Sequence, residues 1–107
     1  MKIYLSPVRP IRSDQKLTYQ FSDETITAAL DNQTETYDLS IIEEGQKIRP
    51  VEYDEAGNET IHIPSILPIH PIISAKRENG VLYVELVNFI GKNASQEERF
   101  PEWKEVN

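Results

Sequence analysis

Two histidines, His62 and His70, are the side chains of this chain best suited to metal binding or proton transfer. They stand eight positions apart in a proline-rich stretch, a spacing that matches no common metal-ligand pattern. The chain has no cysteine that could complete a zinc site. We therefore expect both histidines to be polar residues at strand ends, and we predict no metal site.

Carboxylates are crowded into Glu43-Glu44 and into the segment from Asp54 to Glu59. A calcium loop beginning at Asp54 would need oxygen ligands at alternate positions and a glycine at the sixth. Ala56 occupies one of the ligand positions, and Gly57 comes too early. We interpret these acids as solvated surface loops that keep the protein soluble.

Ser65 is a candidate nucleophile only if it lies in a Gly-x-Ser-x-Gly turn or beside a histidine–carboxylate pair. It lies between Pro64 and Ile66, with neither context in the sequence. The four glycines, at positions 45, 57, 80 and 91, form no phosphate-binding loop. We predict that the chain is not an enzyme, with no catalytic residues and no cofactor.

Aromatic side chains could instead form a surface that binds carbohydrate or peptide. Tyrosines on strands are also commonly half-buried residues at the rim of a core, so both interpretations stay open. The residues concerned are Tyr4, Tyr19, Tyr37, Tyr53, Tyr83 and Trp103.

The element that must position these residues is a hairpin over Ile72–Ile90, the longest apolar, β-rich run. Asn79-Gly80 divides it, and both residues of a type I′ turn need the positive φ that this pair readily adopts. A three-residue loop would mix apolar and polar residues on each face, whereas a two-residue turn separates them. The expected pairs are Glu78 with Val81, Lys76 with Tyr83, Ala75 with Val84, Ser74 with Glu85, and Ile73 with Leu86.

The first forty residues predict a four-strand meander with short connections. The expected strands are Lys2–Val8, Leu17–Phe21, Thr25–Leu30 and Thr34–Leu39, with a loop over Arg9–Asp14. The segment Ser40–Gly45 predicts a helical turn that ends at Gly45. Two short strands, Ile48–Tyr53 and Thr60–Ile63, are expected on either side of residues 54–58.

The segment Ile63–Ile73 alternates isoleucines with prolines, which remove amide donors and favour extended backbone. We predict an extended crossover that contributes about half of its apolar side chains to the core. The others would form an exposed strip that contacts a protein partner or a second copy of the chain. The candidate partner-binding residues are Ile66, Ile69, Tyr53 and Tyr83.

The C-terminal tail, residues 95–107, begins with Ser95-Gln96-Glu97-Glu98, which matches a capping box. This pattern predicts one helical turn from Ser95 to about Phe100, ended by Pro101. Phe100 and Trp103 are expected to anchor the tail on the sheet, with Trp103 largely shielded.

With 107 residues the chain is expected to form one small domain, residues 1–107. Its net charge of −7 repels phosphate backbones and anionic membranes, and its basic clusters are small. No segment has the length of a signal peptide or a bilayer span. We expect no nucleic-acid or membrane partner. We predict an all-β fold, mainly antiparallel, doubled into a small sandwich or curled as a meander, with at most one or two short helical turns.

Three segments carry a resemblance to a known group: MKIYLSPVR, TETYDLSIIEEG and VLYVELVNFIGKNASQEERFPEW. They resemble small uncharacterised proteins encoded in the tail-gene modules of tailed bacteriophages and prophages. The match covers roughly two thirds of the chain, and its most specific parts are the start and Glu98-Arg99-Phe100-Pro101. The segment Ile48–Ile73 departs from the group's pattern because it is longer and carries the crossover.

The resemblance implies a setting in phage or prophage tail assembly, in the host bacterial cytoplasm or in the virion, but no catalytic site. The leading hypothesis is a non-enzymatic structural or assembly accessory that acts through protein–protein contacts. The alternative is a small ligand-binding module that recognises glycan or peptide through surface tyrosines. An enzyme acting through the acidic cluster is a third, formal alternative.

Overall fold

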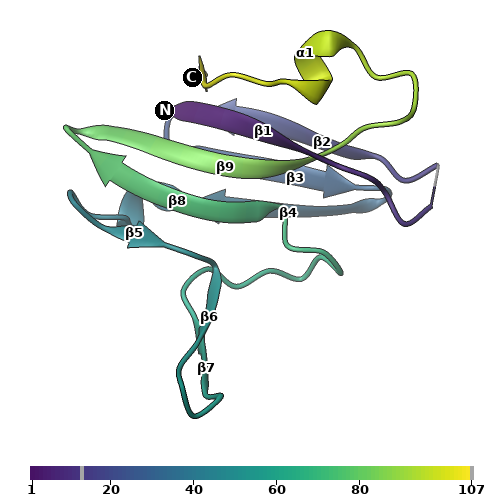
Figure 1. The fold of residues 1–107 in the computed structure, drawn as a ribbon. Coiled ribbons are helices and arrows are strands. Elements are labelled where there is room, and N and C mark those ends of the chain that lie inside the picture. Colours follow the sequence, from purple (N-terminus) through teal and green to yellow (C-terminus); the bar gives the residue numbers. More distant parts are fainter. Residues whose placement is uncertain (13, 107) are drawn as a thin grey trace.

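The computed structural model describes residues 1–12 and 14–106. Ser13 of the expected Arg9–Asp14 loop and Asn107 of the tail lie outside the described residues. Within the described part the strands form three sheets, mostly antiparallel and none closed, with one 3-10 turn and one short α-helix. The all-β prediction is therefore confirmed (Figure 1).

The largest sheet has five strands in the order β10-β1-β9-β8-β5. Parallel pairing joins β1 to β9, so the first strand is inserted beside a strand made much later in the chain. The predicted four-strand meander is wrong in this respect, because β1 pairs with β9 and β10 and not with β2. The bounds are β1 Lys2–Val8, β5 Lys47–Ile48, β8 Ile72–Glu78, β9 Val81–Phe89 and β10 Lys104–Glu105.

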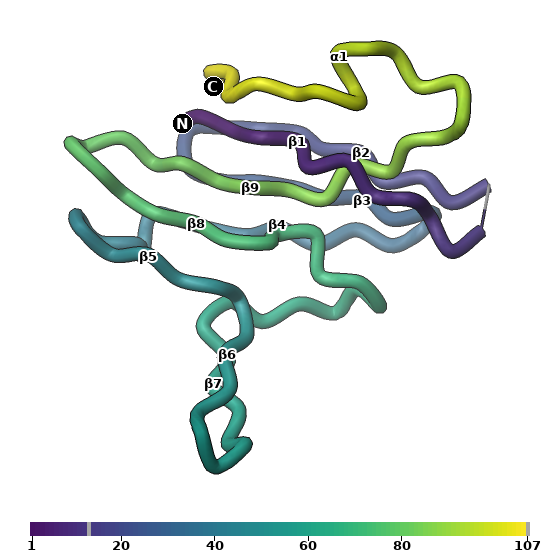
Figure 2. Tube along the Cα trace, viewed as in Figure 1, coloured from purple at the N-terminus to yellow at the C-terminus, as the bar shows by residue number. Residues whose placement is uncertain are grey.

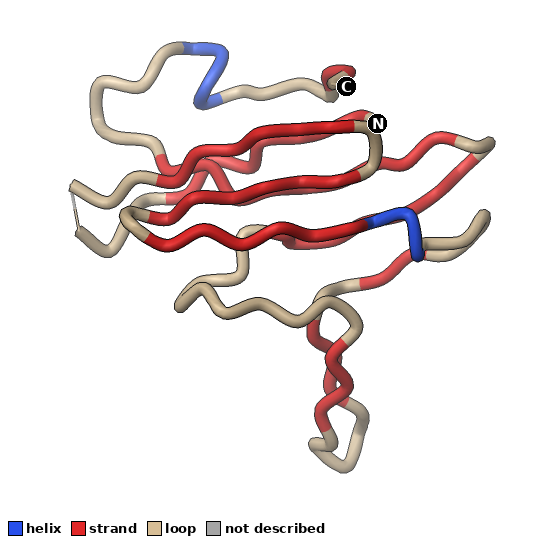
Figure 3. Tube along the Cα trace, turned by 180° about the vertical axis from the view of Figure 1, so that it is seen from behind, coloured by secondary structure: helices blue, strands red, loops and turns tan. Residues whose placement is uncertain are grey.

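A three-stranded antiparallel meander, β2-β3-β4, lies behind β1, β9 and β8 in Figure 1 and in front in Figure 3. Its strands are β2 Leu17–Ser22, β3 Thr25–Leu30 and β4 Gln33–Asp38. A 3-10 turn, η1 Leu39–Ile41, follows β4 directly and is capped by the Asp38 side chain. The helical turn predicted over Ser40–Gly45 begins one residue earlier, because Asp38 caps it, and it ends at Ile41, where the Ile42 amide bonds to the Leu39 carbonyl.

The core fills the space between these two sheets, which confirms the sandwich arrangement. Along each strand alternate residues face inward, so every second side chain points toward the core, and most of these are apolar. The buried set draws on β1, β3, β4, β5, β8, β9, η1 and the crossover. It comprises Ile3, Ile26, Ala28, Leu30, Tyr37, Leu39, Ile42, Ile48, Ile63, Leu67, Ile72, Ala75, Leu82, Val84 and Leu86.

The β8–β9 hairpin turns at Asn79-Gly80, with φ values of 54° and 77°, as a type I′ turn requires. The predicted register holds from Glu78–Val81 to Ser74–Glu85. It then fails, because a bulge places Ile72 opposite Leu86 in place of Ile73. The extra residue lets Ile72, directly after Pro71, reach the core.

Glu44 is exposed, as predicted for a solvated acid, and it also binds this turn from outside. Its carboxylate accepts hydrogen bonds from the backbone amides of Asn79, at 2.8 Å, and Gly80, at 2.6 Å. These two amides lie in the turn itself, where the Glu44 carboxylate supplies charge-assisted acceptors. The acidic segment before β5 is thereby tied to the hairpin.

Arg77, on β8, ties the two sheets together at the same end of the sandwich. Its guanidinium donates two hydrogen bonds to the Glu24 carboxylate, at 2.7 and 2.8 Å, and Nε donates to the Ile42 carbonyl at 2.6 Å. Glu24 lies in the β2–β3 turn, so this bidentate pair spans the two layers. The hydrogen bonds hold the pKa of Glu24 below its usual value.

A two-stranded ribbon, β6 Val51–Tyr53 and β7 Glu59–Ile61, projects from the sandwich (Figures 1 and 2). The expected strand Ile48–Tyr53 is broken at Pro50, which lacks an amide donor and whose carbonyl accepts from His62 and Ile63. This break turns the chain out of the large sheet and into the ribbon. We call residues 50–62 the arm.

The crossover from Ile63 to β8 is irregular, as predicted, and half of its six apolar side chains are buried. Ile63, Leu67 and Ile72 belong to the core, whereas Ile66 is 69% exposed and Ile69 packs partly against the core. The last two residues of the predicted crossover, Ile72 and Ile73, already belong to β8.

The tail forms the predicted capping box, with α1 spanning Gln96–Arg99 and Phe100 at its C-cap. After α1 the chain returns along β1, where β10 pairs with Lys2 and Ile3. Among the described residues, no helix has the length and apolar character needed to span a bilayer.

We predict that Gly80→Val lowers the free energy of unfolding by about 1–2 kcal/mol, the cost of left-handed backbone for a residue with a Cβ. A Cβ at Gly80 would meet no atom within 4 Å, so the backbone conformation alone is tested. Gly91→Val is the matched control, because Gly91 also has open space but no positive φ. Chemical denaturation of both variants checks this, and equal losses would contradict it.

Candidate functional site

Three aromatic side chains gather on the outer face of the large sheet, the face turned away from the core. Tyr4 on β1 and Tyr83 on β9 both point outward, because their strand neighbours Ile3, Leu82 and Val84 point into the core. Trp103 reaches them from the segment that leads into β10. We call Tyr4, Tyr83 and Trp103 the aromatic face.

The three rings are in mutual contact through Trp103. Its ring centroid lies 5.5 Å from that of Tyr4, with the planes inclined by 48°, and 5.5 Å from that of Tyr83, in an edge-to-face arrangement at 86°. Both distances fall in the range of favourable aromatic pairs. Trp103 remains 45% exposed, so the indole offers surface to a partner.

Lysines flank the aromatic face. Lys2, Tyr83, Lys76 and Lys47 stand opposite one another on β1, β9, β8 and β5, and therefore form one row across the sheet. The ammonium groups of Lys2 and Lys76 lie 5.9 and 5.3 Å from the Tyr83 ring centroid, as cation–π contacts.

Acids and hydroxyls complete this face, so it is mixed in charge. Lys76 also pairs with Glu78 at 3.3 Å. The next row places Glu85 between Tyr4 and Ser74. Aromatic rings surrounded by ammonium, carboxylate and hydroxyl groups can bury apolar area and donate and accept hydrogen bonds. This combination suits recognition of a protein surface or a sugar.

The six aromatic residues singled out in the sequence divide between this face and structural positions. Tyr37 is buried, and Tyr19 is half-buried with its hydroxyl donating to the Val87 carbonyl. Tyr53 is 67% exposed on the arm, where its hydroxyl donates to Glu59. The signal that could have found the face was the predicted register, which already placed Tyr83 opposite Lys76.

The four residues predicted to bind a partner lie on three separate elements. Tyr53 is on the arm, Ile66 and Ile69 are in the crossover, and Tyr83 is on the outer face of the large sheet. Ile66 and Tyr53 are exposed, whereas Ile69 and Tyr83 are half-buried.

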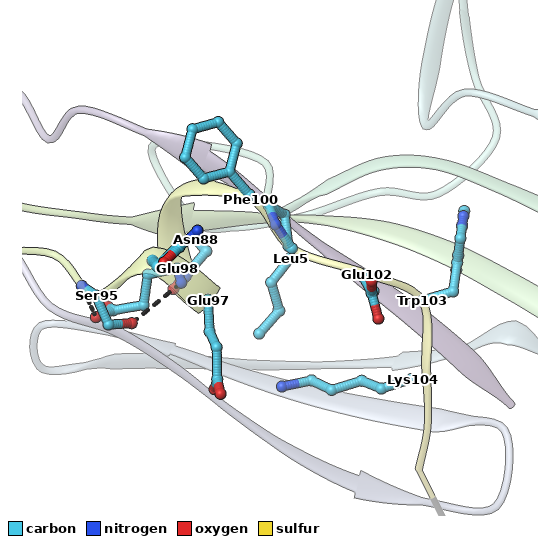
Figure 4. A pocket seen from close by; sticks show the side chains of 11 residues that line it. Leu5, Asn88, Ser95, Glu97, Glu98, Phe100, Glu102, Trp103 and Lys104 are labelled. Atoms are coloured by element: carbon cyan, nitrogen blue, oxygen red, sulfur yellow. Dashed lines mark hydrogen bonds between the residues drawn. The ribbon is translucent and has the colours of Figure 1, made fainter.

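A groove of about 800 Å³ lies between β1, α1 and the returning tail (Figure 4). Leu5 and Lys104 extend to one side of the tail, whereas Phe100 and Trp103 extend to the other. Ser95 and Glu98 are already bonded to each other in the capping box. Phe100 is 72% exposed, so the prediction that it anchors the tail is wrong, and Trp103 is less shielded than predicted. Trp103 does contact the sheet as predicted, and β10 and Val106 hold the tail together with it.

Ser65, Tyr37 and His70 form a partly buried polar cluster that holds the crossover in place. The Tyr37 hydroxyl and Ser65 Oγ are 2.6 Å apart, and the His70 ring lies 5.4 Å from the Tyr37 ring. His70 Nε2 donates to the Ile63 carbonyl at 2.9 Å, and Nδ1 accepts from the Ile72 amide at 3.1 Å. Both ring nitrogens therefore fasten the two ends of the crossover, a structural role that the expected strand-end position did not capture.

The acidic segment at the tip of the arm is an Asx-type turn. The Asp54 carboxylate accepts from the amides of Ala56 and Asn58, at 2.9 and 2.8 Å, and these bonds hold its pKa below the usual value. In residues 1–12 and 14–106, no group of three or more His, Asp or Glu side chains could hold a metal ion.

Comparison of the chain with protein-family models, with curated proteins and with solved structures gives no match.

We predict that Trp103→Ala lowers the free energy of unfolding by about 1–2 kcal/mol, because it removes two aromatic pairs. Phe100→Ala should change it by less than about 0.5 kcal/mol, since that ring is exposed. Denaturant titration of the two variants gives the comparison. A larger loss for Phe100→Ala would show that the tail docks differently.

We predict that stability falls as the pH drops below about 6.5. Burial lowers the pKa of His70 beneath its ordinary 6.5, so the unfolded chain binds this proton more readily than the folded one. The stability that the neutral His70 ring contributes is fully present above pH 6.5. It is lost as the pH falls toward the pKa of His70 in the folded chain. Thermal melts between pH 7.5 and 5.5 should show the slope, which His70→Asn removes and His62→Asn retains.

Proposed function

We propose that this chain is a non-enzymatic structural or assembly accessory of a bacteriophage or prophage tail module that acts through protein–protein contacts. The observation that carries the contact role is the aromatic face. Tyrosine and tryptophan are enriched at protein interfaces because they bury large areas while keeping a polar group, and Trp103 is partly exposed. The three sequence segments that resemble proteins of phage tail modules support the placement in tail assembly.

The position of the aromatic face also supports this role. Tyr4 and Tyr83 lie on regular strands of the large sheet and Trp103 packs against both rings, so partner contacts would be made by preordered side chains and would cost little ordering entropy. The groups that could start chemistry are engaged elsewhere: Ser65 and His70 fasten the crossover, and Asp54 closes a turn.

Recognition of a glycan or peptide is a second candidate, and the same face favours it. Sugars stack on aromatic rings and bond to nearby carboxylates, hydroxyls and ammonium groups, all of which flank Tyr4 and Tyr83. The two candidates differ in the ligand and share the surface.

The test is affinity capture of tagged protein from bacteria producing the phage, with bound proteins identified by mass spectrometry. We expect a structural tail protein to be captured, and we expect Trp103→Ser with Tyr83→Ser to reduce its recovery at least about tenfold. Phe100→Ser is the matched control, because it removes an exposed aromatic ring outside the face. Loss of glycan-array binding in the double variant, without tail-protein capture, would favour the second candidate. Recovery that is insensitive to the double variant would contradict both.

A further inference from the structure

The sheets of the described chain end in six strand edges, and five of these carry features that oppose pairing with another chain. β5 and β10 have two residues each, and β6 and β7 have three each on an acidic arm. The β4 edge carries Glu35 and Asp38. The sixth edge, β2, has none of these protections.

β2 is a regular six-residue strand, LTYQFS, with no charged residue, proline or glycine. Its pairing with β3 runs without a bulge from Leu17–Leu30 to Ser22–Thr25. Thr18, Gln20 and Ser22 are exposed on the outer face, whereas Leu17, Tyr19 and Phe21 are only half-buried against the core. An uncharged, regular edge of this length is a template for another strand.

The backbone direction of the open edge follows from the hairpin geometry. Ser22 and Thr25 close a two-residue turn, and such a closing pair exchanges backbone hydrogen bonds. Alternate residues of β2, at 18, 20 and 22, therefore bond to β3. The backbone groups of Leu17, Tyr19 and Phe21 point to the open side, within the described part of the chain.

We propose that β2 pairs antiparallel with β2 of a second copy, about a two-fold axis at Tyr19. Leu17 then stands opposite Phe21 of the other copy, and Thr18 opposite Gln20, so each face keeps its character. Lys16 then stands opposite Ser22 of the other copy at both ends of the pairing, so no two like charges face each other across it. An axis at Gln20 would instead place Leu17 opposite Asp23, which leaves an apolar side chain unpaired.

The pairing joins two three-stranded sheets into one of six strands, in the order β4-β3-β2-β2-β3-β4. Each copy carries a net charge of −7, and the uncharged edge lets the copies approach with least repulsion. The outer β4 edges stay acidic, so the assembly closes at a dimer. This interface is separate from the aromatic face, and it goes beyond the proposed function.

The test uses two double variants at exposed positions of the full chain. Thr18→Lys with Gln20→Lys sets like charges opposite each other twice across the two-fold axis. Thr18→Lys with Gln20→Glu sets opposite charges at the same places. Thr34→Lys with Thr36→Lys, on the β4 edge, is the control, because it adds the same charge to the same sheet face. Sedimentation equilibrium gives the mass, and circular dichroism with thermal melting checks the fold.

We expect the unmodified chain, the Lys/Glu variant and the β4 control to be dimers. The Lys/Lys variant should be a folded monomer, with its dimer dissociation constant raised at least about tenfold. A monomeric unmodified chain up to about 1 mM would overturn the proposal, since weaker pairing has no consequence at attainable concentrations. A dimer that survives in the Lys/Lys variant, or that is lost equally in the Lys/Glu variant, would also overturn it. Tail-protein capture with a monomeric chain would leave the proposed function standing.

Discussion

The meeting of the two layers depends on Arg77, a single residue that bonds to three other segments of the chain. Its side chain reaches the Glu24 carboxylate in the β2–β3 turn and the Ile42 carbonyl after η1. Its backbone amide donates to the Gln46 carbonyl, and its own carbonyl accepts from Gly45. Removing the guanidinium would leave a carboxylate and a carbonyl without partners at the seam between the sheets, a loss larger than that of one surface ion pair. The apolar core supplies most of the driving force, and Arg77 sets how its two halves meet.

The local features of this fold could be predicted from short-range rules. Asn79-Gly80 fixes the hairpin turn, Ser95 and Glu98 form their capping box, and period-two patterning gives β2, β3 and β4 within one or two residues. The failures concern long-range competition. β1 alternates like any meander strand, and its sequence carries no sign that it pairs in parallel with β9. The bulge at Ile73 arises because Ile72 reaches the core beside Pro71. Counting residue pairs outward from the turn does not take this burial into account.

Only the part of the candidate site that lies in the hairpin could be predicted, because short-range rules give the hairpin register but not the pairing of distant segments. The hairpin register placed Tyr83 beside Lys76, but Tyr4 and Trp103 join them only through β1 and the returning tail. Phe100 and Trp103 look equivalent in the sequence, yet the turn ended by Pro101 directs one ring to solvent and the other onto the sheet. Glu44 and His70 illustrate another limit. The Glu44 carboxylate binds the amides of a distant hairpin turn, and the His70 ring nitrogens bind backbone groups at the two ends of an irregular crossover. Such contacts leave no spacing pattern to find.

The parallel pairing of β1 with β9 has a consequence for how the chain reaches its native state. The β2–β3 and β8–β9 hairpins close over two-residue turns, so they can form within microseconds of collapse. β1 must instead wait for a strand whose paired residues lie about eighty positions later, and a high mean separation of contacting residues slows folding. During that interval the edge of β9 that later receives β1 is unpaired, and the uncharged β2 edge is already formed. A chain in which β1 has not yet paired therefore exposes two strand edges, those of β9 and β2, and unpaired edges of this kind make the yield of refolding depend on protein concentration.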